Sequence, residues 1–365
     1  MKRFIRIIAL FMAPIVLLCG VFFAGLLRSG ELCDSAALAD ATVRGEVALY
    51  GLGYRDDTRA YKQRVTAQKK ADFLVLGTSR AMQFRAQFFD ADSFYNAGGA
   101  TAYLPQMLFF LQSLPEESLP SHLLLVLDQY FYNETWGNTN VERDSAPFVF
   151  QEADTGYSFR RMLTGYPDSK YSLRQVLQTP RGVYGMSAAG KNAGFYADGS
   201  YSYGTALLHP EQALDYGFKN TLSRIDRGID RFEYGAAVSA ENVAATATLL
   251  QFCAEKGIAV TAILPPYAPT VWQAMQTSGN YGYLNQLSPV LLPLFASYGF
   301  ELFDYSYLPE TNDAQYVDGF HGSDRVYAAV CVRLAKDSAH LRDFLDENAL
   351  AALFASKGNP LSLTV

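Results

Sequence analysis

Residues 72–80 constrain the fold of this chain more than any other stretch. Phe73 to Leu76 are four consecutive large apolar residues, which predict a short, fully buried strand of a parallel sheet. Gly77 then ends the strand, and Ser79 lies at the turn into an expected helix. Open α/β folds hold their ligands at the carboxyl ends of the strands, where helix starts offer free backbone N–H groups. Ser79 is therefore a candidate functional residue.

Strands and helices alternate over most of the chain beyond this stretch. Further strands are predicted at 93–95, 122–127, 258–264 and 300–303, and helices at 57–70, 102–114, 240–256, 283–298, 324–336 and 339–356. The alternation predicts an α/β fold with three layers, α/β/α, around a mainly parallel, flavodoxin-like sheet. It stops between about residues 134 and 239, in a stretch rich in Tyr, Gly, Asn, Asp and Ser. We interpret this insertion as a cap over the strand ends or as a plain surface excursion.

The first 28 residues predict a membrane segment. Three basic residues, Lys2, Arg3 and Arg6, precede 21 uncharged residues, which Arg28 closes. At about 1.5 Å per residue, a helix of that length crosses a bilayer core. No small-x-small site follows directly, which favours an uncleaved anchor with the basic residues inside over a removed signal peptide. In both cases the rest of the chain is expected outside the cytoplasm, with a partly helical approach at 29–70 and the main domain at 71–365.

Composition argues against several classes of protein. The net charge of −6 is spread along the chain without a basic block, which argues against nucleic acid binding. The four cysteines, Cys19, Cys33, Cys253 and Cys331, form no C-x-x-C pair, and the four histidines are scattered. We therefore expect no zinc site and no cofactor. The cysteines are interpreted as buried thiols, with a bridge between the last two as the alternative.

A serine becomes a nucleophile only beside a base that a carboxylate orients. Among the histidines, only His321 follows an acid by three residues in a loop before a late helix, and that acid is Asp318. Asp304 and Asp313 are spare acids. Each residue also has an ordinary structural role available: Ser79 as a helix N-cap, Asp318 as a turn residue and His321 as a partly buried hydrogen bonder.

Taken in this order, the elements resemble the SGNH, or GDSL-type, hydrolase superfamily. Its nucleophilic serine follows the first strand in a Gly-Asp-Ser motif, which Gly77-Thr78-Ser79 matches with Thr in place of Asp. Its late D-x-x-H motif matches Asp318 and His321. Its second block places an oxyanion-binding glycine after the second strand, and Asn96-Ala97-Gly98-Gly99 is similar to that block. The resemblance implies a Ser79–His321–Asp318 triad, with the backbone N–H of Gly98 or Gly99 as an oxyanion donor and Asn96 beside them.

The sequence departs from the family at the third block, Gly-x-Asn-Asp. Residues 128–133 read Asp-Gln-Tyr-Phe-Tyr-Asn instead, so Gln129 or Asn133 could supply the second oxyanion donor, or no residue does. An oxyanion donor contributes about 2.7–4 kcal/mol, so its loss would slow an esterase without abolishing activity. Arg80 could attract an anionic phosphate or carboxylate, or form a surface ion pair. The resemblance covers about residues 72–133 and 258–338.

The single anchor, the exported domain and the missing third block together resemble cell-envelope branches of the superfamily. These include the D-alanyl-lipoteichoic acid transfer protein and the alginate and peptidoglycan O-acetylation proteins. The resemblance implies an esterase or O-acyltransferase that acts on an envelope or exported glycan or polymer through an acyl-serine. A membrane protein that donates the acyl group is the partner it implies. The alternative is a non-catalytic envelope protein that binds glycan or an acyltransferase partner.

Overall fold

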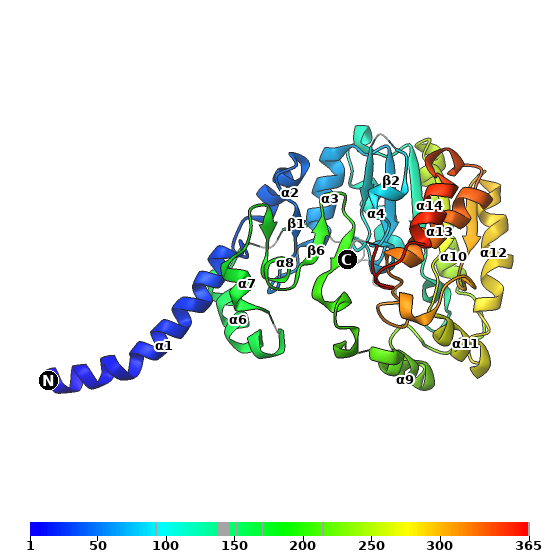
Figure 1. Ribbon diagram of the computed structural model, residues 1–365. Coiled ribbons are helices and arrows are strands. Elements are labelled where there is room, and N and C mark those ends of the chain that lie inside the picture. Colours follow the sequence, from blue (N-terminus) through cyan, green and yellow to red (C-terminus); the bar gives the residue numbers. More distant parts are fainter. Residues whose placement is uncertain (92, 137–146, 151, 170, 214, 364–365) are drawn as a thin grey trace. The chain divides into compact units, whose positions relative to one another are not determined.

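The computed structural model of the chain describes residues 1–91, 93–136, 147–150, 152–169, 171–213 and 215–363 (Figure 1). The chain folds as two compact units. The first contains residues 1–57, 149–197 and 201–205, and the second contains residues 58–148, 198–200 and 206–365. Residues 29–57 thus fold together with part of the expected insertion, which differs from the prediction of an approach segment followed by one interrupted domain.

The second unit contains a five-stranded sheet in which every pair of neighbours is parallel. Its strands are β2 Phe73–Gly77, β3 Phe94–Asn96, β4 His122–Val126, β8 Ala259–Leu264 and β9 Glu301–Asp304. All five predicted strands are confirmed within one residue at each end. The spatial order is β3-β2-β4-β8-β9, which is the flavodoxin-like order 2-1-3-4-5. In this order the direction of winding changes between β2 and β4, and ligand sites of open α/β sheets lie at that point.

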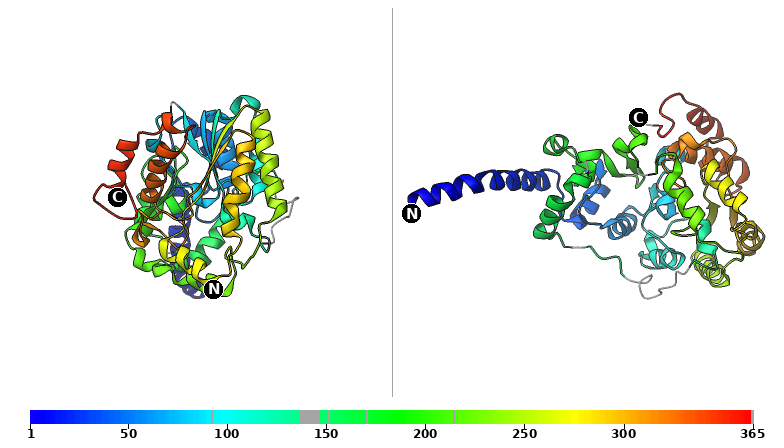
Figure 2. Two further views of the ribbon diagram at one scale, coloured as in Figure 1. Left: turned by 90° about the vertical axis from the view of Figure 1, so that its right-hand side faces the viewer. Right: turned by 90° about the horizontal axis from the view of Figure 1, so that it is seen from below.

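Five of the six predicted helices of this unit are confirmed within two residues at each end, whereas the sixth, predicted at 339–356, begins only at Glu347, after a separate 3₁₀ turn at Arg342–Phe344. The six helices are α3 Thr58–Lys69, α4 Leu104–Gln112, α10 Ala240–Glu255, α12 Leu284–Ser297, α13 Asp324–Asp337 and α14 Glu347–Phe354. In the left view of Figure 2, α10 and α12 lie to one side of the strands, and α13 and α14 lie to the other. Sequence analysis missed α11 Pro269–Ser278, although Pro at its start and Gly279 at its end are helix boundary signals.

The prediction of a helix directly after Ser79 is wrong. Residues Ser79–Ala81 form a single 3₁₀ turn. The side chain of Asn96 donates hydrogen bonds to the carbonyl oxygens of Ala81 (2.9 Å) and Phe84 (2.7 Å). An α-helix continuing from Ser79 would use these carbonyls for its own backbone hydrogen bonds. The amide of Asn96 therefore satisfies the carbonyl groups that the next helical turn would otherwise satisfy.

In its described residues, the first unit contains a mixed four-stranded sheet and four helices besides α1; of these, only α2 lies in a segment that was expected to be partly helical. Its strands follow the order β5 Val183–Tyr184, β1 Leu49–Tyr50, β6 Ala193–Tyr196 and β7 Tyr201–Tyr203. Its helices are α2 Ser35–Val43, α6 Thr155–Ser169, α7 Leu173–Leu177 and α8 Met186–Lys191. Strands of two to four residues are too short to show an alternating pattern.

The predicted apolar N-terminal segment forms one long helix, α1 Lys2–Arg28, which joins the first unit at its last turn. There Leu26 is buried against Met162 and Val176. The preceding part of α1 is exposed, and the helix is long and apolar enough to cross a membrane. Just beyond α1, the buried Glu31 carboxylate accepts the backbone N–H groups of Gly53, Tyr54 and Met186, which tethers the helix end to the unit.

The four cysteines are free thiols in this structure. Cys253 and Cys331 are buried, and burial raises the pKa of both thiols. The bridge between them, which was the alternative interpretation, is not formed.

Candidate active site

Ser79 is held at the carboxyl end of β2 with its hydroxyl turned toward His321. The N-cap of the 3₁₀ turn is Thr78, whose Oγ1 accepts the backbone N–H of Arg80 (3.2 Å) and donates to Asp128 Oδ2 (2.6 Å). Ser79 is therefore not the N-cap. Its Oγ lies 2.8 Å from Nε2 of His321 instead, a distance at which a histidine can take the serine proton.

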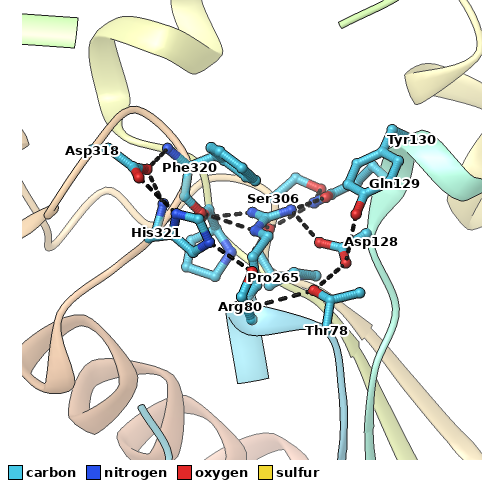
Figure 3. A network of polar contacts seen from close by, with 12 residues as sticks. Thr78, Arg80, Asp128, Gln129, Tyr130, Pro265, Ser306, Asp318, Phe320 and His321 are labelled. Carbon is cyan, nitrogen blue, oxygen red and sulfur yellow. Dashed lines mark hydrogen bonds and ion pairs between the residues drawn. The ribbon is translucent and has the colours of Figure 1, made fainter. Parts of the chain in front are cut away.

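Asp318 orients the other side of the same imidazole ring (Figure 3). Its Oδ2 lies 2.7 Å from Nδ1 of His321, while its Oδ1 accepts the backbone N–H groups of Phe320 (3.0 Å) and His321 (2.8 Å). Burial raises the pKa of Asp318, but the charge and hydrogen bond of His321 and the two N–H donors outweigh it and lower the pKa to about 2. Asp318 is thus both a turn residue and an ionised partner that fixes the ring. The spare acids have other partners: Asp304 accepts the backbone N–H of Ser306, and Asp313 accepts the backbone N–H of Thr270.

The ionised Asp318 stabilises the fold over a defined range of pH. Its pKa in the folded chain, about 2, is below its ordinary value of 3.8. A carboxyl group with a lowered pKa stabilises fully above its unfolded pKa, and this stabilisation is lost as the pH falls through the folded value. The difference amounts to about 2 kcal/mol. Between about pH 5 and pH 2, the free energy of unfolding of the wild type should therefore fall by about 2 kcal/mol more than that of Asp318→Asn. Urea titrations at the two pH values measure this difference. Parallel curves for the two proteins would contradict this account.

Residues of the insertion also hold the loop that carries Asp318 and His321. The N–H of Gly319 donates to Asp215 Oδ2 (3.1 Å), and Asp215 also accepts the N–H (2.9 Å) and the hydroxyl (2.6 Å) of Thr221 in α9 Lys219–Arg227. A Cβ at Gly319 would lie 2.4 Å from Cγ2 of Thr221, so only glycine allows this close approach. Residues 206–239 thus support the histidine loop within the second unit.

Arg80 is buried under the site, with a relative exposure of 1%. It makes five hydrogen bonds, and its guanidinium group has five N–H donors. The acceptors are Asp128 Oδ1 (3.0 Å), Gln129 Oε1 (2.8 Å) and the carbonyl oxygens of Pro265, Pro266 and Phe320 (2.9 Å each). Its guanidinium carbon also lies 4.3 Å from the ring centroid of Tyr267.

These contacts correct both roles predicted for Arg80. Substrate attraction and a surface ion pair each require an exposed guanidinium group, whereas this one is buried and fully paired. It joins the ends of β2, β4 and β8 to the carbonyl oxygen beside His321, as Figure 3 shows. We conclude that Arg80 positions the serine turn and the histidine loop relative to each other.

The two side-chain amides considered as oxyanion donors are engaged in structural hydrogen bonds. Gln129 is fully buried, and its Nε2 donates to the carbonyl of Pro265 (2.6 Å) and to Ser306 Oγ (2.8 Å). The Nδ2 group of Asn133 donates to the carbonyl of Glu233 (2.6 Å). These contacts use both N–H groups of Gln129, which excludes it as the second oxyanion donor, and they engage the amide of Asn133 with Glu233. A sequence shows that an amide is present but not where its N–H groups point.

The backbone donors implied by the second block are also used within the protein. The N–H of Gly98 donates to Asn96 Oδ1 (2.7 Å), and the N–H of Gly99 donates to the carbonyls of Gly77 and Thr78 (3.0 Å each). Asn96 and the glycines therefore shape the serine turn rather than offering free donors. Among the described residues, the backbone N–H of Ser79 itself has no protein acceptor, which leaves it available beside the hydroxyl.

A buried lysine that sequence analysis missed supports the second block. Lys62 in α3 is completely buried, and its Nζ donates to the carbonyl oxygens of Asn96 (2.7 Å) and Gly199. Burial lowers the pKa of Lys62 well below its ordinary value. Its partners come from residues 34 and 137 positions away in the chain, so no local pattern could have identified it.

The described residues contain no group of three or more His, Cys, Asp or Glu side chains placed to hold a metal ion. The sequence matches no protein-family model and no curated protein.

Proposed function

We propose that this protein is an extracytoplasmic serine esterase or O-acyltransferase that works through an acyl-Ser79 intermediate. The observation that carries the proposal is the chain of two hydrogen bonds from Ser79 Oγ to His321 Nε2 (2.8 Å) and from His321 Nδ1 to Asp318 Oδ2 (2.7 Å). Nucleophile, base and orienting acid in this geometry form the arrangement of serine hydrolases. The proposed fold of the second unit is a three-layer α/β/α domain, which would place this triad at the winding change of the sheet.

In the proposed mechanism, Ser79 Oγ attacks the carbonyl carbon of an ester while His321 Nε2 takes the hydroxyl proton. Asp318 keeps the ring in the tautomer with a proton on Nδ1 and stabilises the imidazolium that forms. The N–H of Ser79 is available to donate to the developing oxyanion. His321 then protonates the leaving alcohol, and the acyl group stays on Ser79. Water or a sugar hydroxyl next gives its proton to His321 and attacks the acyl-serine, and the proton returns to Ser79.

The proposed substrate class is based on the expected location of the main domain outside the cytoplasm and on the resemblance to envelope proteins, and not on the triad. The apolar helix α1 supports a single-pass anchor with the main domain outside the cytoplasm. Esters found there include those of envelope or exported glycans and polymers, and a membrane protein would supply the acyl group if the reaction is a transfer. Whether water or an alcohol accepts the acyl group depends on how far the bound state excludes water. The second candidate is a non-catalytic protein that keeps the fold to bind glycan or an acyltransferase.

A covalent serine probe tests the enzyme proposal. Full-length protein in lipid nanodiscs should react with a fluorophosphonate, and peptide mapping should place the adduct on Ser79. Ser79→Ala should lose labelling, whereas the matched control Ser297→Ala, which changes an exposed hydroxyl bonded only within its own helix, should keep it. Absence of labelling in a wild-type protein with a normal circular dichroism spectrum would overturn the proposal and favour the binding protein.

A further inference from the structure

The second unit contains a cleft that the triad does not account for, with a volume of about 520 Å³. Its walls include two aromatic residues, two arginines and two acids: Tyr103, Trp136, Arg224, Arg231, Asp230 and Glu233. They come from the segments that follow β3 and β4 and from the insertion. A cleft of this volume is large enough to hold a small ligand.

One aromatic residue, Phe320, connects the arginines of this cleft to the histidine of the candidate triad. The guanidinium carbons of Arg224 and Arg231 lie 5.5 Å and 5.8 Å from the ring centroid of Phe320. The ring of Phe320 in turn lies 4.2 Å, centroid to centroid, from the ring of His321. The cleft is also lined by Ala102, next to Thr101, whose hydroxyl donates to the carbonyl of Gly77 at the serine turn. The side chain of Phe320 thus links the arginines of the cleft to His321.

Two charged side chains of the cleft have buried polar atoms without a partner among the described residues. These atoms are Nε of Arg224 and Oε2 of Glu233. The other hydrogen bonds of the two side chains are local: Arg224 donates to Thr221 Oγ1 (2.9 Å) and to the carbonyl of Asp230 (3.4 Å), and Glu233 Oε1 accepts the N–H of Arg231 (3.3 Å). Leaving such a group unpaired costs free energy. Both residues line the cleft, and hydroxyl groups can accept a hydrogen bond from an arginine and donate one to a carboxylate.

Two aromatic side chains, Tyr103 and Trp136, line the cleft together with these polar groups. The rings of Tyr103 and Trp136 lie 5.9 Å apart at an angle of 34°, and Trp136 also packs edge-on against Tyr130 (4.9 Å). Both wall residues are partly exposed. Rings of this kind join an apolar face to a polar edge. A pyranose ring has the complementary form, because its C–H groups make an apolar face and its hydroxyls line the rim.

The charges of the cleft favour an uncharged ligand. The two arginines are balanced by Asp230 and Glu233, so an anionic group would meet two carboxylates as well as two guanidinium groups. The backbone also holds this segment in an unusual conformation, because Asp230 (φ 54°) and Arg231 (φ 77°) are both left-handed. Such conformations cost free energy in residues other than glycine and concentrate at functional sites.

We infer that this cleft binds a hydroxyl-rich, uncharged sugar unit of the substrate, with one sugar face on Tyr103 and Trp136 and its hydroxyls on Arg224 and Glu233. This inference rests on the proposed function in one respect, namely that the bound sugar carries the ester or receives the acyl group. Binding of the sugar itself requires no chemistry at Ser79.

A binding titration tests the sugar site independently of catalysis. The chain has two tryptophans, and Trp272 is not among the residues that line this cleft. In full-length Trp272→Phe protein in phosphatidylcholine vesicles, which contain neither sugar-headed detergent nor a second protein, Trp136 is the only tryptophan reporter. A cello-oligosaccharide should change its fluorescence with saturation, and Glu233→Gln should weaken binding by about 10-fold or more, since it removes a charged acceptor. The matched control Glu255→Gln, an exposed helix residue, should not change the affinity.

Rates on two esters then connect the cleft to the triad. Trp136→Ala should lower kcat/KM for an O-acetylated cello-oligosaccharide by about 10-fold or more while changing kcat/KM for 4-nitrophenyl acetate less than about twofold. An O-acetylated oligogalacturonate, with a carboxylate on each sugar, should be a poorer substrate than the uncharged one. No saturable binding of the cello-oligosaccharide, tighter binding of the oligogalacturonate, or equal losses on both esters would overturn the sugar site. If wild-type protein binds the oligosaccharide but neither hydrolyses the esters nor reacts with the fluorophosphonate, the enzyme proposal fails and the sugar site stands.

Discussion

Replacing either Ser79 or His321 by alanine is expected to lower the rate of 4-nitrophenyl acetate hydrolysis by about 10⁴-fold or more. Ser79 Oγ and His321 Nε2 lie 2.8 Å apart, so the proton that leaves the serine has one acceptor in the proposed mechanism. Without the histidine the hydroxyl remains a poor nucleophile, and without the serine the histidine has no nucleophile to activate. The two residues act as a unit, so the double variant should be no slower than either single variant.

The control for this prediction is His209→Ala. His209 is an exposed histidine whose side chain pairs with Glu211 at the surface (3.4 Å), so its removal should leave the hydrolysis rate unchanged. Both single variants should also keep the wild-type circular dichroism spectrum. Multiplicative losses in the double variant, or a His321→Ala enzyme within about tenfold of the wild type, would show that the two residues do not work together.

The parts of the fold that could be predicted are those encoded by local patterns. The parallel strands are short runs of apolar residues, since Phe73–Leu76 and Leu123–Leu125 are almost completely buried, and such runs are visible in the sequence. The parallel pairing of the strands follows from the alternation of strand and helix. Ser79, Asp318 and His321 could be selected because a Gly-x-Ser turn and a D-x-x-H turn are local too. The predicted constellation is the one that the structure brings together.

The parts that could not be predicted depend on the direction of side chains and on distant partners. Both roles predicted for Arg80, attraction of an anion and a surface ion pair, require an exposed side chain, whereas its five acceptors come from segments spread between residues 128 and 320. The amides of Gln129 and Asn133 have the right chemistry for an oxyanion hole but point elsewhere. The division of the insertion between two units likewise rests on long-range packing, because strands such as Leu49–Tyr50 pair with residues more than 130 positions away.

Arg80→Met is expected to destabilise the second unit by about 3–5 kcal/mol. Methionine fills much of the same volume, but it leaves the buried carboxylate of Asp128 without its ion-pair partner (3.0 Å) and leaves the carbonyls of Pro265, Pro266 and Phe320 without their donor. Breaking a buried pair from one side is costly because the remaining charge keeps its desolvation penalty. The variant should also lose activity beyond its loss of folded protein, since the carbonyl of Phe320 adjoins the histidine. Urea denaturation and the hydrolysis rate per folded molecule measure the two effects.

Asp128 separates the contribution of charge from that of packing. The double variant Arg80→Met/Asp128→Asn removes the unpaired charge but still lacks the donors for the three carbonyls, so it should be more stable than Arg80→Met while remaining less stable than the wild type. Lysine at position 80 keeps the charge but has three donors instead of five. Arg80→Lys should therefore recover stability more fully than activity, because a point charge can pair with Asp128 without also holding the histidine loop. Equal recovery of both would mean that Arg80 acts through charge alone, whereas the five hydrogen bonds of the guanidinium group favour a role in aligning the serine turn with His321.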